Sequence, residues 1–139
     1  MSAQDLMTPN PVTVTSKASV AEVLDLMREQ EIRHVPVVDG DAVVGILSDR
    51  DLAHCDITRL LTVDGAEALR RELSMPVVNL MSPDVIAVGP EAELIEVIDL
   101  LLEHRVGAVP VVRPETGELI GIISFVDVLE ALRDSLLGD

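Results

Sequence analysis

The sequence has few aromatic and few basic residues. Phe125 is the only aromatic residue among 139, and Lys17 is the only lysine. Ten basic residues stand against 25 acidic ones, which gives a formal net charge of −15. Proteins that bind nucleic acids need a basic face, and those that bind single strands add aromatic stacking platforms. The composition therefore excludes nucleic acid as a partner, and it argues against an anionic membrane surface for the same reason.

Cysteine and long apolar runs are also scarce. Cys55 is the only cysteine, so the chain cannot form an intramolecular disulfide, which fits a reducing compartment. Apolar runs such as residues 35–38 are too short to span a membrane, and no signal peptide is evident. We therefore expect a globular cytoplasmic protein. Two explanations of the acidity stay open: adaptation to high internal salt, or genomic bias combined with ordinary solubility.

Three sequence blocks occur twice in the same order. The first two pairs are 74 residues apart, and the third is 76 apart because the turn before its second copy is two residues longer. The pairs are residues 7–14 and 81–88 (MTPNPVTV and MSPDVIAV), residues 35–38 and 109–112 (VPVV in both), and residues 45–51 and 121–127 (GILSDRD and GIISFVD). Such self-similarity indicates two copies of one structural unit.

Each copy is predicted to form strand, helix, strand, strand, helix. In the first copy, Ser19 caps a helix that runs to about Gln30, with apolar residues at the spacing of one buried face. The remaining predicted elements of this copy are an entry strand at 12–14, a hairpin of 35–38 with 43–47, and a helix that opens after Ser48. In the second copy they are a helix at 91–103, a hairpin of 108–112 with 119–123, and a helix from Phe125 to about Leu136.

The predicted fold class is α/β (α+β), built from two β-α-β-β-α repeats. Neither copy alone covers its sheet, so we expect the two to pack sheet to sheet about a pseudo-twofold axis. The predicted boundaries are a first domain at 1–58, a connector at 59–78 that contains a helix at 66–73, and a second domain at 79–139.

The repeated blocks resemble the CBS domain family, named after cystathionine β-synthase. The resemblance rests on the opening Met-Thr/Ser-Pro, the apolar-Pro-Val-Val strand and the Gly-x-x-Ser-x-x-Asp segment, each present twice, and it covers about residues 3–136. It implies a paired regulatory unit, a Bateman module, that binds AMP, ADP, ATP or S-adenosylmethionine in two clefts between the copies. It implies no catalytic activity and no cofactor.

The Ser-x-x-Asp segments have a chemistry of their own. Ser48 and Ser124 each follow a strand and open a helix, where backbone N–H groups favour a phosphate. Asp51 and Asp127 lie three residues on, and an ionised carboxylate suits the two donors of a ribose diol. The same spacing is also that of a capping box, in which the pair only satisfies the first helical N–H groups. Both interpretations stay open, and they are compatible.

The resemblance also implies which residues share each cleft, since the Ser/Asp pair of one copy faces the entry strand and central strand of the other. One predicted group is Ser124, Asp127, Thr8, Val12, Thr13, Ile32 and Arg33. The other is Ser48, Asp51, Ser82, Ile86, Ala87, Val106 and Gly107. The apolar members would enclose an adenine, although they could equally belong to the core.

The candidate cations for phosphate are Arg33, His34 and Arg50, with His104 and Arg105 beside them. In the two matching stretches the cations come from the first copy only, because Gly107, Ala108 and Val126 occupy the corresponding positions of the second copy. We therefore expect the clefts to differ, with one strong site and a preference for the Asp127 group. S-adenosylmethionine, which carries a sulfonium, is the main rival to a nucleotide in these acidic surroundings.

Catalysis and metal binding find little support in the sequence. The histidines and Cys55 lack a metal-ligand spacing, and no motif anchors a Ser/His/Asp arrangement. The predicted function is thus a ligand sensor that controls an unidentified partner protein, with a ligand-independent dimerisation scaffold as the alternative. We also expect a homodimer, because the predicted helices carry more leucines than one small core needs, at 100–102 and at 129, 132 and 136.

Overall fold

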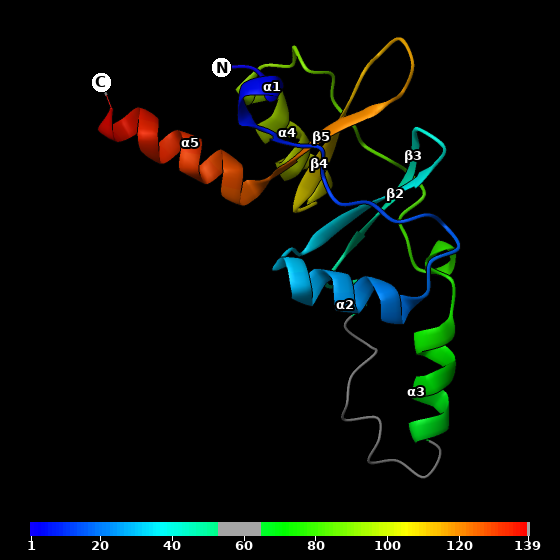
Figure 1. Cartoon of the computed structure of the whole chain (residues 1–139). Coiled ribbons are helices and arrows are strands. Elements are labelled where there is room, and N and C mark those ends of the chain that lie inside the picture. The colour runs from blue at the N-terminus through cyan, green and yellow to red at the C-terminus, as the bar shows by residue number, and fades with distance from the viewer. Residues whose placement is uncertain (53–64, 139) are drawn as a thin grey trace. The chain divides into compact units, whose positions relative to one another are not determined.

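The computed structural model describes residues 1–52 and 65–138, and its chain forms two compact units. The central unit comprises Val12–Asp39 and Val44–Val85. The terminal unit comprises Met1–Pro11, Gly40–Val43 and Ile86–Asp139, and so contains both ends of the chain (Figure 1). The predicted α/β class with two repeats is confirmed, and the sheet-to-sheet packing stays a prediction.

The terminal unit is built on a three-stranded antiparallel sheet. Strand β5 (Leu119–Ser124) lies between β1 (Thr8–Pro9) and β4 (Ala108–Val112). The helices of this unit are α1 (Ala3–Leu6), α4 (Leu94–His104) and α5 (Phe125–Leu137). Val109, Val111 and Ile123 are fully buried and form the centre of its core with residues of all three helices.

The central unit holds the hairpin of the first repeat. Strands β2 (His34–Asp39) and β3 (Ala42–Ser48) pair, and the first two residues of β3 group with the terminal unit. Its helices are α2 (Val20–Gln30), α3 (Gly65–Ser74) and the 3₁₀ turn η2 (Val77–Asn79). Val35, Val37 and Leu47 are buried at positions that match the core residues of the other unit.

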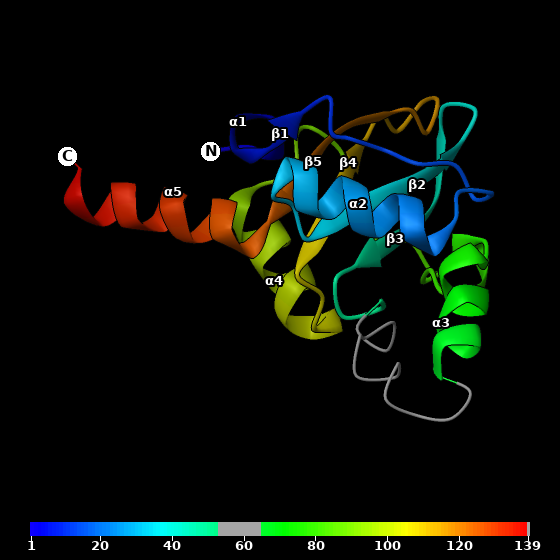
Figure 2. The ribbon, with the colours of Figure 1, turned by 60° about the horizontal axis from the view of Figure 1, so that its bottom comes forward.

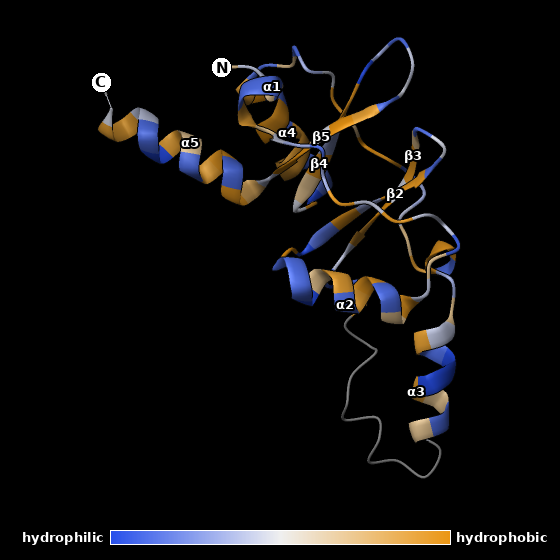
Figure 3. Ribbon diagram, in the orientation of Figure 1, coloured by the Kyte–Doolittle hydropathy of each residue, from blue (hydrophilic) through white to orange (hydrophobic). Residues whose placement is uncertain are grey.

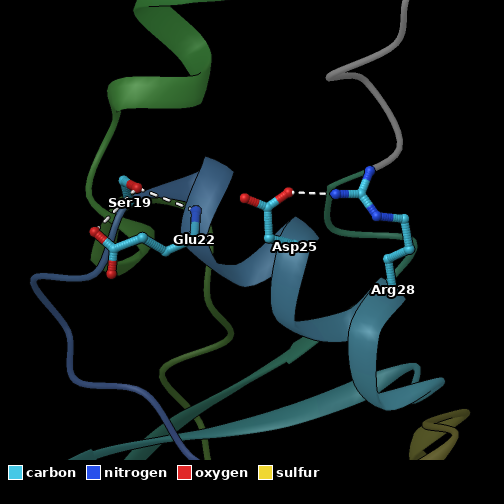
Figure 4. Close-up of polar contacts among 4 residues, drawn as sticks. All are labelled: Ser19, Glu22, Asp25 and Arg28. Atoms are coloured by element: carbon cyan, nitrogen blue, oxygen red, sulfur yellow. Dashed lines mark hydrogen bonds and ion pairs between the residues drawn. The ribbon is translucent and has the colours of Figure 1, made fainter.

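Helix α2 begins and ends as its sequence predicts. The Ser19 hydroxyl accepts a hydrogen bond from the Glu22 backbone N–H at 3.2 Å, and Arg28 pairs with Asp25 at 2.8 Å (Figure 4). Glu31 ends the helix in the left-handed conformation, with φ of 54°. Arg105 ends α4 in the same way, with φ of 53°, so the repeats share this C-cap although neither has glycine there.

The entry segments are exchanged between the repeats, an arrangement that no local sequence pattern predicted and that only the family resemblance implied. Strand β1 of the first repeat pairs with β5 of the second, Thr8 opposite Ile122, and Ala3 of α1 is buried in the terminal core. In the same manner, Ser82 bridges Ile46, and Val77 is buried in the central core. Each compact unit therefore contains the hairpin of one repeat and the start of the other.

A methionine and a glycine hold each exchanged segment. The side chain of Met7 covers Gly121, where an added Cβ would lie only 2.7 Å from the Met7 Cγ. Met81 covers Gly45, with a corresponding distance of 2.9 Å to its Cγ. Glycine is needed at both positions because the methionine occupies the space of any side chain.

Two predicted elements differ from the structure. The entry strand at 12–14 is reduced to a single bridge of Val14 with Val37, as is its counterpart, Val88 with Val111. The helix predicted after Ser48 is a turn through Leu52, and its continuation lies outside the described residues, as does Cys55. The boundaries 1–58, 59–78 and 79–139 stay a prediction.

Candidate functional site

The Ser-x-x-Asp segment of the terminal unit forms the start of α5. The Ser124 backbone N–H donates to Asp127 Oδ2 at 2.8 Å, and the Ser124 hydroxyl donates to the same oxygen at 3.1 Å. The Asp127 N–H donates back to Ser124 Oγ at 3.3 Å, which completes a capping box. Both side chains are half-buried, so the pair is held in place yet open to one side.

The central unit repeats this geometry after β3. The Ser48 N–H donates to Asp51 Oδ2 at 2.8 Å, and the Asp51 N–H donates to Ser48 Oγ at 3.3 Å. Both side chains are again half-buried. The capping interpretation is therefore seen directly at both motifs, and binding of a ligand there stays a prediction.

Each capping carboxylate uses one oxygen. Within residues 1–52 and 65–138, Oδ2 of Asp51 and of Asp127 accepts every hydrogen bond to these carboxylates, and Oδ1 accepts none. A carboxylate oxygen with two unused lone pairs can accept both hydroxyls of a vicinal diol or one of them. The cap thus orients the carboxylate without consuming its capacity to bind a ribose.

A third Ser-x-x-Asp pair provides an internal comparison. Ser2 and Asp5 form a related cap on α1, in which the Ser2 N–H donates to Asp5 Oδ2 at 3.0 Å and the Asp5 N–H donates to the Ser2 carbonyl at 2.9 Å rather than to the hydroxyl. That backbone hydrogen bond and the one from the Ser2 hydroxyl lower the pKa of Asp5 from its ordinary value of 3.8. Asp5 is fully exposed and follows no strand of the sheet, so it shows what the cap does by itself.

The exchanged entry segments bring Thr8 and Ser82 to these motifs. Thr8 lies opposite Ile122, two residues before Ser124, and Ser82 bridges Ile46, two residues before Ser48. Both hydroxyl residues are exposed. The structure therefore brings each of them into the unit that contains its predicted Ser/Asp pair.

The starts of the central strands contact the motif of their own repeat. The Asp49 N–H donates to the Arg33 carbonyl at 2.9 Å, and the Phe125 N–H donates to the Gly107 carbonyl at 3.0 Å. Arg33 thus lies in the central unit beside Ser48, while its predicted group contains Asp127 of the terminal unit. That assignment across the repeats stays a prediction.

His34 occupies a half-buried position in charged surroundings. Burial lowers the pKa of His34 below its ordinary value of 6.5, Arg33 acts in the same direction, and the nearby carboxylates of Asp49 and Asp51 oppose it. The imidazole is therefore neutral near pH 7 and gains a charge only in acid. Asp49 was not among the predicted residues, although its place inside the repeated GILSDRD block could have marked it.

The remaining predicted residues divide by burial. Three of them, Ile32, Ile86 and Val106, are half-buried and pack against one of the two cores. Each therefore contributes to a core while part of its side chain stays accessible. Val12 and Ala87 are also half-buried, whereas Thr13 and Arg50 are exposed. Val12, Thr13 and Arg50 lie in the central unit, and Ile86, Ala87 and Val106 lie in the terminal unit.

Other kinds of site are not apparent in the described part of the chain. Residues 1–52 and 65–138 contain no group of three or more His, Cys, Asp or Glu side chains that could hold a metal ion. None of the described helices is long and apolar enough to cross a membrane. A hollow beside α3, lined by Glu67, Arg70, Arg71, Ser74 and Met75, contains none of the predicted ligand residues.

Comparison with known proteins identifies the family. The family model of the CBS domain matches residues 3–57 and 77–134, and the chain therefore belongs to the CBS domain family, with two copies of the domain. The chain is 28% identical over 127 residues to the CBS domain-containing protein YhcV of Bacillus subtilis, covering 91% of this chain and 82% of that protein.

Two further similarities concern a larger protein and a solved structure. The chain is 32% identical over 126 residues to the inosine-5′-monophosphate dehydrogenase of Korarchaeum cryptofilum, but it spans only 23% of that protein's length. The crystal structure of CBSX2 in complex with AMP, a protein of Arabidopsis thaliana, matches with a TM-score of 0.79 and 30% identity, over 97% of this chain and 98% of that one.

Proposed function

We propose that this chain binds an adenosine-containing ligand through Asp51 and Asp127 and thereby regulates a partner protein, without catalysing a reaction. The observation that carries the proposal is the pair of matching, half-buried caps, in each of which one carboxylate oxygen accepts no hydrogen bond from the described part of the chain. The similarity to CBSX2, whose crystal structure contains AMP, supports the choice of an adenosine ligand.

The ligand's parts match the chemistry of the motif. Oδ1 of the aspartate would accept the ribose hydroxyls, and the serine hydroxyl and first N–H groups of the turn would face a phosphate. The half-buried apolar residues would cover the adenine. Arg33 and Arg50 would supply positive charge to a phosphate, since the net charge of the chain opposes any polyanion. His34 would add a hydrogen bond, and a positive charge only in acid, because its pKa is lowered.

AMP and ADP should therefore bind with higher affinity than free ATP. Magnesium, which neutralises part of the triphosphate charge, should reduce this difference in affinity. S-adenosylmethionine is the competing ligand because its sulfonium suits acidic surroundings. The regulated partner would be a larger enzyme or signalling protein, as the similarity to a segment of a dehydrogenase suggests. We assign no catalytic residue and no cofactor.

Calorimetric titration with AMP, ADP, ATP and S-adenosylmethionine tests the proposal. Asp51→Asn and Asp127→Asn replace one acceptor by a donor, so each lost ribose contact should weaken binding by about 1.5–3 kcal/mol, or about tenfold to a hundredfold. Asp5→Asn is the control, because Asp5 also accepts the backbone N–H of a serine three residues earlier and lies outside both proposed sites. This substitution should leave affinity unchanged. Parental affinity in the Asp51→Asn/Asp127→Asn double variant would show that these sites are wrong.

The ligand-independent scaffold is the second candidate. It gains support from the caps themselves, since they explain both motifs without a ligand. A thermal-shift series separates the two functions: a ligand at a hundredfold excess over its dissociation constant must stabilise the folded state by about 2.7 kcal/mol. A flat series with all four ligands favours the scaffold.

A further inference from the structure

Met7 and Met81 place their thioether sulfurs against the backbone of a strand. The Met7 side chain lies on Gly121 of β5, and the Met81 side chain lies on Gly45 of β3. In each pair the sulfur is the atom nearest to the place that a Cβ on the glycine would take, at 2.5 Å for Met81 and closer for Met7. Both units therefore present the oxidisable atom of a methionine at the same point of the fold.

Exposure separates these two methionines from the one in the central core. Met7 and Met81 are half-buried, so a molecule as small as hydrogen peroxide can reach part of each side chain. Met27 belongs to the central core and is only 7% exposed. A peroxide should therefore oxidise Met7 and Met81 before it oxidises Met27.

Oxidation changes the side chain at the point of contact. Hydrogen peroxide transfers one oxygen atom to the sulfur, its O–O bond breaks and water leaves, so the thioether loses two electrons and becomes a sulfoxide. An oxygen directed at the strand would overlap the glycine backbone. An oxygen directed away would still make the side chain polar against β5 and β3, which are hydrophobic along most of their length (Figure 3). The sulfoxide thus opposes the contact in either orientation.

The entry segment of the terminal unit pairs with β5 over a short distance. Strand β1 has only two residues and lies beside β5 (Figure 2). Pro9, which lies opposite Gly121, has no N–H to donate. A further hydrogen bond runs from the Asn10 N–H to the Ile120 carbonyl at 3.2 Å. After α1, the methionine contact is therefore a large share of what fixes this segment.

The central unit holds its entry segment in the same way. Ser82 forms a single bridge to Ile46 of β3, with its N–H donating to the Ile46 carbonyl at 3.3 Å. Pro83 follows and again has no N–H to donate. Loss of the methionine contact should therefore release either segment from its strand.

We propose that Met7 and Met81 are sites of reversible oxidation by hydrogen peroxide, and that their sulfoxides release the entry segments from β5 and β3. In the reverse step a methionine sulfoxide reductase, with a dithiol as electron donor, removes the oxygen as water and restores the thioether. Release would also carry Thr8 and Ser82 away from the caps. Only the loss of ligand affinity that follows from this last step rests on the proposed function.

Peptide mass spectrometry after treatment with hydrogen peroxide tests the first part of the proposal. Met1, which is 60% exposed, should be oxidised first, Met7 and Met81 next, and Met27 last. Oxidation of Met27 before Met7 and Met81 would overturn the proposal, because it would mean that the contacts on glycine protect the sulfurs.

Amide hydrogen exchange, measured by NMR on the reduced and the oxidised protein, tests the release. The amides of Asn10 and Ser82 should exchange about tenfold faster or more after oxidation, because their hydrogen bonds to the strands depend on the methionine contacts. Treatment with a methionine sulfoxide reductase should restore the slow exchange. The measurement contains no ligand, so its outcome is separate from that of the ligand titrations.

Two double variants assign the effect to the proposed sulfurs. In Met7→Leu/Met81→Leu, which keeps similar volumes without sulfur, peroxide should leave the exchange of both amides unchanged. Met1→Leu/Met75→Leu is the matched control: it removes the same number of sulfurs, from residues that are not nearest to either glycine, and should respond to peroxide like the parent. If the first variant unfolds, norleucine, which has the unbranched shape of methionine without sulfur, replaces methionine throughout.

Two further results would overturn the proposal. One is a protein oxidised at Met7 and Met81 in which both amides keep their parental exchange rates. The other is faster exchange in peroxide-treated Met7→Leu/Met81→Leu, which would assign the effect to another sulfur, such as that of Cys55.

Discussion

The central and terminal units have one backbone plan and different side chains around it. Both end a buried strand in a Ser-x-x-Asp cap, and both place a methionine over a glycine. The central unit has seven basic and twelve acidic residues, whereas the terminal unit has three and thirteen, so their net charges are −5 and −10. The comparison shows that a few positions determine the backbone and leave the others free to set the chemistry.

The surroundings of the two caps differ most. Arg33, His34, Asp49 and Arg50 surround the central cap, and Gly107, Ala108, Phe125 and Val126 occupy the matching places of the terminal cap. One cap is thus charged and titratable, while the other is apolar. A ligand bound at the Ser/Asp pairs, as proposed above, would consequently meet different phosphate surroundings in the two units.

The glycine contacts should give the largest effect on stability. Gly121→Ala and Gly45→Ala each force a Cβ into the methionine above, and such overpacking should lower the free energy of unfolding by about 1–3 kcal/mol. The terminal unit should suffer more, because the Met7 side chain lies closer to its glycine than Met81 does. Urea unfolding measures both variants.

The control for this prediction shortens the methionine side chain that contacts the new Cβ. Met7→Ala/Gly121→Ala should recover part of the loss, since the smaller side chain leaves room for the new Cβ. Unchanged urea midpoints in both single variants would mean that the methionine side chains do not fill the space above the two glycines.

The left-handed C-caps should respond equally in the two units. Glu31→Gly and Arg105→Gly relieve a conformation that costs a non-glycine residue energy, and each should stabilise the protein by about 0.5–1 kcal/mol. Chemical denaturation measures the gain. Glu31→Ala and Arg105→Ala change the same charges without relieving the backbone, so a gain in these controls would contradict the explanation.

His34 should make the stability of the central unit depend on pH. Because its pKa is lowered on folding, the unfolded chain binds more protons below about pH 6.5, and stability falls as the pH decreases through that window. In His34→Gln, the free energy of unfolding, measured with urea, should differ less between pH 7.5 and pH 5.5 than it does in the parent. An identical pH profile in the two proteins would exclude this role, and Ala108, the counterpart, cannot titrate.

The smallest expected effect is a difference between the two units in how strongly salt stabilises them. Screening relieves self-repulsion, so the urea midpoint should rise with KCl, and the terminal unit, with twice the net negative charge, should gain more. Amide hydrogen exchange measures the two units separately, because β4 and β5 belong to the terminal unit and β2 and β3 to the central one. Equal protection gains in both sheets would count against charge as the cause.

Much of the fold could be predicted because its signals are local. Local signals include the Ser19 cap, the buried apolar face of α2 and the two VPVV strands. Each depends on neighbours within a few residues and lies where the pattern predicted it. The capping box at Ser124 and Asp127 was likewise one of two predicted outcomes. The exchange of the entry segments could not be predicted from local patterns, since Met7 and Gly121 are 114 residues apart and no periodic pattern connects them. Only the family resemblance implied that each Ser/Asp pair faces the entry strand of the other copy.

The sequence by itself determined that the chain has two similar halves, where most of their helices and strands lie, and which carboxylates and hydroxyls stand at the turns. Only the tertiary structure decided that each half completes the other's core and that a methionine lies on a glycine in each unit. The physical reason is that hydrogen bonding and side-chain periodicity act along the chain, whereas burial depends on which distant segment supplies the covering surface.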